Sequence, residues 1–159
     1  MARALPDLPM DPTVMVRLLR IGLFGMSSFF EPVFRDLDLS ENSFHALCLL
    51  VATEKGTASP SELSEMVGTS RANMTRLLQE LETADLISRK AAVRDGRRHV
   101  IAITPAGRRK VRDTVPRIAE PLRLAFSELS GEEMTQLASL LRKLIVSFDK
   151  SAVALRAVA

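Results

Sequence analysis

Two helix-start signals follow each other closely in the middle of the chain, and they constrain its fold more than any other feature. Residues 59–62 read Ser-Pro-Ser-Glu, a capping box with proline at the first helical position, which predicts a short helix over residues 60–67. Gly68 can supply the left-handed turn that ends this helix. Ser70 then caps another helix, predicted from Arg71 to about Thr83. Two helices joined by so tight a turn are typical of a helix-turn-helix.

The pattern changes from helical to extended directly after the second of these helices. Residues 87–92 and 99–104 are short runs of the β type. Between them, residues 93–98 read Val-Arg-Asp-Gly-Arg-Arg, in which Asp-Gly is the hairpin-turn signal. An arginine-rich hairpin that follows a helix-turn-helix predicts a wing.

A long apolar helix is predicted near the N-terminus. Residues 1–10 are expected to form an extended arm, after which Asp11 caps a helix that has Pro12 at its first position and runs to about Asp36. Apolar side chains occur on nearly every side of this helix. A helix with so little polar surface cannot lie on the outside of a monomer of 159 residues, so we expect it to pack against a partner.

The other segments are predicted to be helical. Ser40 caps a helix that ends near Glu54, the pair Thr104-Pro105 starts another, and residues 130–133 form a second capping box that opens the last helix. In the last two helices apolar residues recur in steps of four and three, which is typical of helices that pack against helices.

The predicted fold class is therefore mainly α with a small β wing, comprising six helices and an antiparallel sheet of two or three strands. We expect one continuous domain-sized unit with three functional parts. They are an N-terminal arm and dimerisation helix (1–39), a winged helix-turn-helix lobe (40–104) and C-terminal dimerisation helices (105–159).

Positive charge gathers in one part of a nearly neutral chain. The formal net charge is +3, yet residues 89–112 carry nine basic residues and a single acid, Asp95. This local surplus is expected of a surface that binds a polyanion, with a solvated charged face as the alternative. The basic residues are Arg89, Lys90, Arg94, Arg97, Arg98, Arg108, Arg109, Lys110 and Arg112.

The helix after Ser70 has one apolar and one polar side. The apolar stripe, expected to face the core, consists of Met74, Leu77, Leu78 and Leu81. The opposite side carries Arg71, Ala72, Asn73, Thr75 and Arg76. These types suit base edges in the major groove of DNA, since Arg can read guanine, Asn adenine, and Thr or Ala the thymine methyl group. The Ser70 hydroxyl and the free N–H groups of the first turn can hold a phosphate. An exposed polar side without a role is the alternative.

The hairpin completes this predicted interface with double-stranded DNA. Arg97 or Arg98 can enter the neighbouring minor groove, where negative potential is focused. Asp95 is expected to brace Arg97 through a charge-assisted hydrogen bond. The predicted DNA contacts in the wing are Arg94, Asp95, Arg97 and Arg98.

The chain resembles the MarR family of bacterial winged helix regulators over about residues 12–155. Ser70 with residues 75–77, then Leu81, Leu86-Ile87 and Arg89, are similar to the family's recognition helix and its exit. Asp95-x-Arg97, followed by Ile101-x-Ile103-Thr104 and Gly107, is similar to its wing and the start of the next helix. One departure is Asp85, where the family usually has Gly. Asp tolerates a left-handed backbone better than most residues, so we expect the turn to survive.

The resemblance implies an obligate homodimer held by N- and C-terminal helices, with Arg97 in the minor groove. It also implies a small-molecule effector between the dimerisation helices and the DNA-binding lobe. Candidate effector-binding residues are Arg20, Phe24, Ser28 and His45. They could hold a phenol or an aromatic carboxylate, with Arg20 or His45 on the acid group and Phe24 on the ring. Dimer core with Arg20 at its rim is an equally good interpretation.

The sequence speaks against several other function classes. Aromatic residues make up 4% of the chain, with no Trp or Tyr, which leaves little material for stacking single-stranded bases. No nucleophile–base–acid set or phosphate loop is visible, so we expect neither an enzyme nor a cofactor. His45 and Cys48 are too few to ligate zinc. Cys48 lies in an apolar run and is expected to be structural rather than redox-active.

Compartment signals favour the cytoplasm. A single cysteine fits a reducing environment, and the N-terminus lacks the pattern of a secretory signal. The most apolar early stretch, residues 21–30, is too short to span a bilayer. We therefore expect a cytoplasmic homodimeric repressor of a pseudo-palindromic operator, without a membrane partner. An architectural or anti-regulator protein that uses the same fold to bind DNA loosely, or to bind another protein, is the competing hypothesis.

Overall fold

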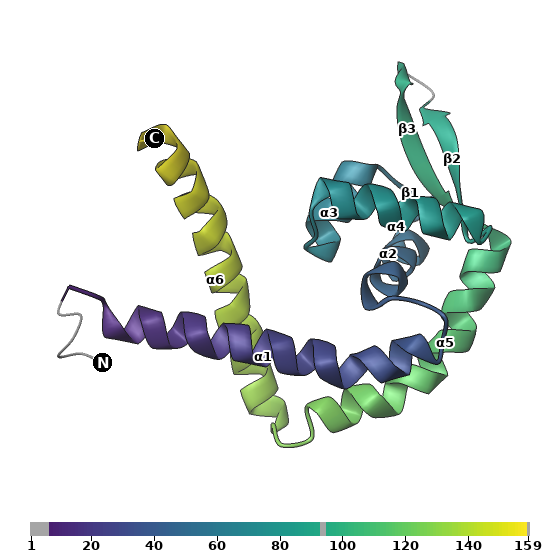
Figure 1. The fold of residues 1–159 in the computed structure, drawn as a ribbon. Coiled ribbons are helices and arrows are strands. Elements are labelled where there is room, and N and C mark those ends of the chain that lie inside the picture. Colours follow the sequence, from purple (N-terminus) through teal and green to yellow (C-terminus); the bar gives the residue numbers. More distant parts are fainter. Residues whose placement is uncertain (1–6, 93–94, 159) are drawn as a thin grey trace. The chain divides into compact units, whose positions relative to one another are not determined.

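The computed structural model describes residues 7–92 and 95–158, and the side chains of residues 7–90 and 100–150. Six helices and one three-stranded sheet occupy this part of the chain, which confirms the predicted fold class (Figure 1). The elements are α1 (Met10–Arg35), α2 (Glu41–Ala52), β1 (Thr57–Ala58), α3 (Pro60–Val67), α4 (Arg71–Thr83), β2 (Ile87–Ala92), β3 (Asp95–Ile103), α5 (Pro105–Ala125) and α6 (Gly131–Val158).

The chain forms two compact units, Met1–Pro121 and Leu122–Ala159. The hydrophobic core lies in the first unit and joins the end of α1 to α2, α3, α4, the sheet and α5. Its largest fully buried side chains are Leu47, Leu50, Leu63, Met74, Leu78, Ile87, Ile101 and Thr114. The boundary at Pro121 separates two compact parts of the chain and does not separate parts by function. The predicted functional division at residues 39 and 104 therefore stays a prediction.

The serine caps explain why the helices begin where they do. Ser40 accepts a hydrogen bond from the Ser43 amide at 3.0 Å. In the capping box of α3, Ser59 Oγ accepts from the Glu62 amide at 3.2 Å and Glu62 Oε2 accepts from the Ser59 amide at 2.7 Å. Gly68 ends this helix at a φ of +73°. Since the caps satisfy amides that have no partner within the helix, both α3 and α4 have the predicted bounds.

Two predicted starts are wrong. Helix α1 begins at Met10 with Pro9 as its N-cap, because the Pro9 carbonyl accepts the Thr13 amide at 3.1 Å and its hydroxyl at 2.7 Å. Pro12 costs no hydrogen bond there, since the first turn has free amides anyway.

Strand β3 was expected from residue 99 but begins at Asp95, so Asp95 and Gly96 belong to the strand and not to the turn. A register shift between Ala91 and Ala92 allows Ala92 to pair with Asp95 and extends the ladder. The short strand β1 was not predicted. It pairs with β3 through Thr57 and Ala58, giving the order β1-β3-β2.

A junction ties the end of α4 to the start of α5. Asp85 has a φ of +57°, which confirms that aspartate tolerates the left-handed turn at this position. Thr104 Oγ1 donates to the Asp85 carbonyl at 2.7 Å and accepts from the Gly107 amide at 2.9 Å. A Cβ atom on Gly107 would collide with the Leu86 carbonyl oxygen. Only glycine therefore lets α5 start this close to the exit of α4.

Most of α1 is apolar and uncovered within the protomer. Nine large hydrophobic side chains are 38–75% exposed, namely Val14, Met15, Val16, Leu18, Ile21, Leu23, Phe24, Met26 and Phe29. A Cβ on Gly22 or Gly25 would meet nothing within 4 Å. Only towards its end does α1 enter the core, through Phe30 and Phe34.

Helix α1 is longer than the apolar stretch that the sequence analysis compared with a membrane span. The stretch 21–30 alone is too short, but the whole helix has 26 residues and contains an 18-residue window with a mean hydropathy of 1.4, enough to cross a membrane by length and composition. The helix carries Arg17 and Arg20 in its middle, and charged residues are costly inside a bilayer.

The second unit, described by itself, contains α6 and the end of α5. No residue of α6 up to Lys150 is buried. Leu140, Ile145 and Phe148 are each more than half exposed. The last helix thus also presents an apolar surface that the protomer leaves open.

Replacing Gly107 with alanine tests the junction. We expect Gly107→Ala to lower the free energy of unfolding by about 1–3 kcal/mol, since the added methyl group forces the backbone apart. Gly131→Ala is the matched control, because a Cβ there meets nothing within 4 Å. Urea unfolding at one fixed protein concentration measures both. Equal stability of the two variants would contradict the packing described here.

Candidate nucleic-acid interface

Burial fixes which side of α4 faces solvent. Its apolar stripe is almost fully buried, with Met74 and Leu78 at 1% and Leu77 and Leu81 at 3% exposure. This confirms the predicted core face. The predicted base-reading residues lie on the remaining surface, with Ser70, Arg71, Ala72, Thr75 and Arg76 exposed and Asn73 half-buried.

Hydrogen bonds determine what the polar side chains can still offer. Ser70 Oγ accepts from the Asn73 amide at 3.2 Å, so its hydroxyl proton is free to donate to an oxygen atom outside the protein. Thr75 Oγ1 donates to the Arg71 carbonyl at 2.9 Å. Its proton is thus used, and a methyl group and oxygen lone pairs remain for a partner.

Arg76 is held at the surface by its neighbours on α4. Its Nη1 donates to Glu80 Oε1 at 2.8 Å and its Nη2 donates to Asn73 Oδ1 at 3.2 Å. Asn73 in turn donates from Nδ2 to Thr69 Oγ1 at 2.7 Å. The sequence interpretation placed Arg76 and Asn73 at the interface but missed Thr69 and Glu80. Their i, i+4 spacing from Asn73 and Arg76 was the available signal.

The hairpin of β2 and β3 follows α4 directly. Asp95, Arg97 and Arg98 lie on strand β3. Their side chains, and all of Arg94, lie outside the described residues, so the brace between Asp95 and Arg97 stays a prediction. Arg89 on β2 is described, and its Nε donates to Glu82 Oε2 at 2.8 Å. This ion pair joins the end of α4 to the hairpin, so one of the nine counted cations is partly neutralised.

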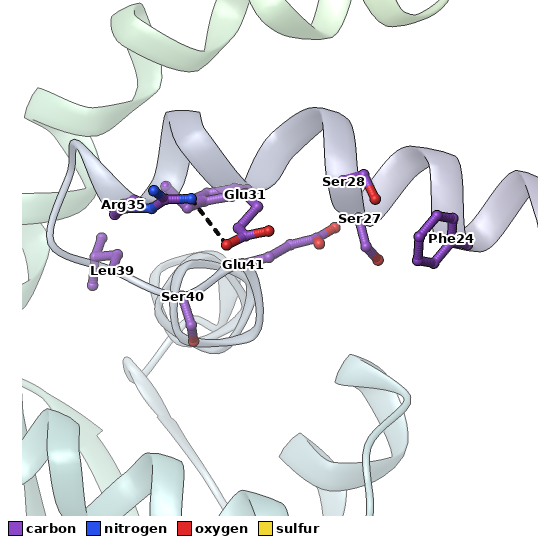
Figure 2. A pocket seen from close by; sticks show the side chains of 9 residues that line it. Phe24, Ser27, Ser28, Glu31, Arg35, Leu39, Ser40 and Glu41 are labelled. Atoms are coloured by element: carbon purple, nitrogen blue, oxygen red, sulfur yellow. Dashed lines mark hydrogen bonds and ion pairs between the residues drawn. The ribbon is translucent and has the colours of Figure 1, made fainter.

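A hollow of about 540 Å³ lies between α1 and the start of α2 (Figure 2). Its lining is mainly apolar with several hydroxyl and carboxylate groups, from Phe24, Ser27, Ser28, Glu31, Phe34, Arg35, Leu39, Ser40 and Glu41. Phe24 and Ser28, both predicted for an effector, thus line one hollow. Arg20 and His45 are exposed and are not among the lining residues.

The charges in this hollow differ from those expected for an acid-binding site. Arg35 is its basic residue, and Arg35 Nη2 donates to Glu31 Oε1 at 2.9 Å. Figure 2 shows Glu41 extending from the start of α2 towards Ser27 on α1. The sequence interpretation missed Ser27, Glu31, Arg35 and Glu41, although Glu31 and Arg35 have the spacing of a helical ion pair.

Cys48 is half-buried, and burial raises the pKa of its thiol. A raised pKa lowers the thiolate fraction at neutral pH, which fits a structural cysteine better than a redox sensor. Among the residues that the structure describes, no group of three His, Cys, Asp or Glu could hold a metal ion.

Comparison with known proteins connects this architecture to one family. The sequence profile of the MarR family matches residues 39–99, which include α2, α3, α4 and β2. The transcriptional repressor MprA of Escherichia coli K12 is 35% identical over 112 residues, covering 70% of this chain. The chain belongs to the MarR family. The alignment spans 64% of the length of MprA.

Solved MarR-type structures share the fold. The chain is similar to Sco3205 of Streptomyces coelicolor, a MarR family regulator solved in complex with DNA, with a TM-score of 0.79 at 18% identity over 87% of this chain and 88% of that one. It is also similar to Bordetella bronchiseptica BpsR, with a TM-score of 0.73 at 24% identity over 80% and 90% of the two chains. These likenesses confirm the winged-helix fold.

Proposed function

We propose that this MarR-family chain is a sequence-specific DNA-binding transcriptional regulator, most simply a repressor, that acts in the cytoplasm as a homodimer. The observation that carries the proposal is the orientation of α4 about its own axis. Its apolar stripe is buried in the core, so Arg71, Asn73 and Arg76 project from the opposite side. Helices of this kind place the residues of their first turns in the major groove. MprA, a transcriptional repressor, and Sco3205, solved with DNA, support the same reading.

The hairpin supplies the second contact in this proposal. Strand β3 carries Arg97 and Arg98 on a hairpin whose other strand, β2, contacts α4, so we expect the hairpin to reach the minor groove beside the major groove that α4 enters. Arginine is favoured there because the narrow groove concentrates negative potential. The ion pair of Arg89 with Glu82 joins strand β2 of the hairpin to the end of α4.

Uncovered apolar surface supports the homodimer. The exposed side chains of α1 are too many and too contiguous for the surface of a monomer in water. Full burial of one such side chain stabilises an interface by about 1.5–3 kcal/mol. A second copy of the chain offers the same surface and can cover it symmetrically. Two recognition helices about one helical turn apart would then meet a pseudo-palindromic operator.

A small phenolic effector in the hollow between α1 and α2 completes the proposal. Phe24 offers a ring face, and Ser27, Ser28 and Ser40 offer hydroxyl groups for a phenol. BpsR, whose DNA binding is regulated by 6-hydroxynicotinic acid, is a structural neighbour that responds to a small aromatic ligand, although that ligand carries a carboxyl group. In this chain Arg35 is paired with Glu31, so a phenol fits better than a carboxylate. Binding beside α1 would release DNA by favouring another spacing of the two recognition helices.

Two arginine variants test the DNA contacts on an operator selected from genomic fragments. We expect Arg76→Ala to weaken operator binding roughly tenfold or more and to relax preference at one base pair. Arg97→Ala should lower the slope of log affinity against log salt by about one unit and reduce preference for A·T-rich flanks. Arg142→Ala on α6 removes one positive charge outside the proposed interface. This control should change neither the operator affinity and its base preference nor the salt slope. If both test variants matched this control, the assignment of the two contacts would be withdrawn.

Sedimentation equilibrium tests the dimer. The chain should have twice its monomer mass of 17.5 kDa. The double variant Leu18→Glu, Ile21→Glu should be monomeric, because two carboxylates cannot be buried in an interface without partners. Met66→Glu, on an exposed methionine of α3, is the matched control and should remain dimeric. A monomeric parent protein, or one that partitions into lipid vesicles, would refute this role of α1.

A matched ligand panel tests the effector. Simple phenols should weaken operator binding by about fivefold or more, the lower end of a typical allosteric coupling. Benzoates of the same size should act less strongly, since their carboxylate meets Glu31 and Glu41. The effect should be lost in Phe24→Ala. Unchanged operator affinity across the whole panel would remove the effector from the proposal.

A further inference from the structure

Four polar side chains, one just before α4 and three on it, form an unbroken hydrogen-bonded row. Asn73 donates to Thr69 at 2.7 Å, and Arg76 donates to Asn73 at 3.2 Å and to Glu80 at 2.8 Å. Asn73, Arg76 and Glu80 are separated by three and four positions and so share one face of α4, and Thr69 lies just before the helix cap at Ser70. The row runs through the two side chains that suit guanine and adenine.

The row holds the Arg76 guanidinium at both ends. Nη2 is bound by Asn73, whose amide is oriented because its nitrogen already donates to Thr69. Nη1 is bound by Glu80. Each terminal nitrogen keeps one further N–H, and Nε–H also remains, so the group can still donate to a base or a phosphate. A free arginine would have to lose side-chain entropy when it docks, and part of that loss is already incurred here.

Glu80 is the unexpected member of this row. Its side chain is 55% exposed on a helix that is proposed to approach a polyanion, where a carboxylate repels phosphate. Glu80 forms an ion pair with Arg76, whereas Glu82 on the same helix is bound to Arg89 of β2. Glu80 also borders a hollow shared with Arg35, but Arg35 is paired with Glu31. The contact with Arg76 is therefore the interaction through which Glu80 can act on the DNA-reading surface.

We propose that Glu80 is a specificity-determining positioning residue. It holds the Arg76 guanidinium in the orientation that reads one base pair, and its charge lowers affinity for DNA of any sequence. Both effects raise the ratio of specific to nonspecific binding. This inference rests on the proposed DNA-binding function and adds to it a residue that need not touch the operator bases.

Two substitutions separate the positioning effect from the charge effect. Glu80→Gln and Glu80→Ala both remove the negative charge, but only glutamine keeps a side-chain oxygen that can accept from Arg76 Nη1. Affinities are measured for the selected operator, for operators with single base-pair changes, and for an unrelated duplex at several salt concentrations. Arg76→Ala identifies the base pair that Arg76 reads. Glu132→Gln, on the first turn of α6, controls for the loss of one charge.

Both Glu80 variants should bind the unrelated duplex more tightly than the parent protein and the Glu132→Gln control. At the base pair read by Arg76, Glu80→Ala should lose roughly tenfold in discrimination, within the range of one bidentate contact. Glu80→Gln should keep discrimination within about twofold of the parent. In an Arg76→Ala background, Glu80→Ala should cause no further loss, because the two residues act as one unit.

The outcomes distinguish this inference from the function on which it rests. A parent protein that shows no sequence preference overturns the proposed function, and the inference with it. A parent that prefers its operator, while both Glu80 variants discriminate as it does, overturns the inference alone. Equal loss of discrimination in the Gln and Ala variants also overturns positioning through the hydrogen bond, since charge then accounts for the whole effect.

Discussion

The packing of one helix stripe determines what the rest of this molecule can do. Met74, Leu77, Leu78 and Leu81 are each at most 3% exposed, so α4 cannot rotate about its axis without exposing apolar surface. Deleting a buried side chain of this size costs about 2–5 kcal/mol, far more than any surface contact of α4 provides. The direction of Arg71, Asn73 and Arg76 is therefore a consequence of the core. The cap at Ser70 and the junction at Thr104 and Gly107 fix the two ends of this arrangement.

The exposed apolar surface of α1 is a second constraint. Helix α1 reaches the core only through its last two turns, and the rest of it presents apolar side chains that one protomer cannot cover. By length and composition the same helix could cross a membrane. Family membership and the arginines in its middle favour a protein partner, and a second copy of the chain has the matching surface. The hollow beside Phe24 borders this helix, so a ligand there would act on the same element that is proposed to hold two copies of the chain together.

Local chemistry explains which parts of the structure were predictable from the sequence. Helices α3 and α4 have the predicted bounds because serine caps and Gly68 are local signals whose effect does not depend on the tertiary fold. Strand β1 was missed because two residues carry no periodicity, and only pairing with β3 makes them a strand. The start of β3 was misplaced because Asp-Gly is a strong turn signal, yet the bulge at Ala91 and Ala92 lets the ladder continue to Asp95.

The residues of the candidate sites also fall into two groups, those predicted from local sequence patterns and those that only the tertiary structure brings together. The exposed residues of α4 followed from helical periodicity, but the row that links Arg76 to Glu80 required side-chain positions. In the effector region, spacing along α1 found Phe24 and Ser28 but selected Arg20 instead of Arg35. The loop that turns α2 back towards α1 brings Ser40 and Glu41 to the hollow, and no helical period predicts that.

Methylation protection of a selected operator tests the central claim most directly. Dimethyl sulfate modifies guanine at N7 in the major groove and adenine at N3 in the minor groove. If two copies of α4 enter successive major grooves, protected guanines should form two clusters about 10 base pairs apart on one face of the duplex, with adenines protected beside them where the hairpins lie. A single cluster, or protection of adenine N3 without any protected guanine, would contradict this account.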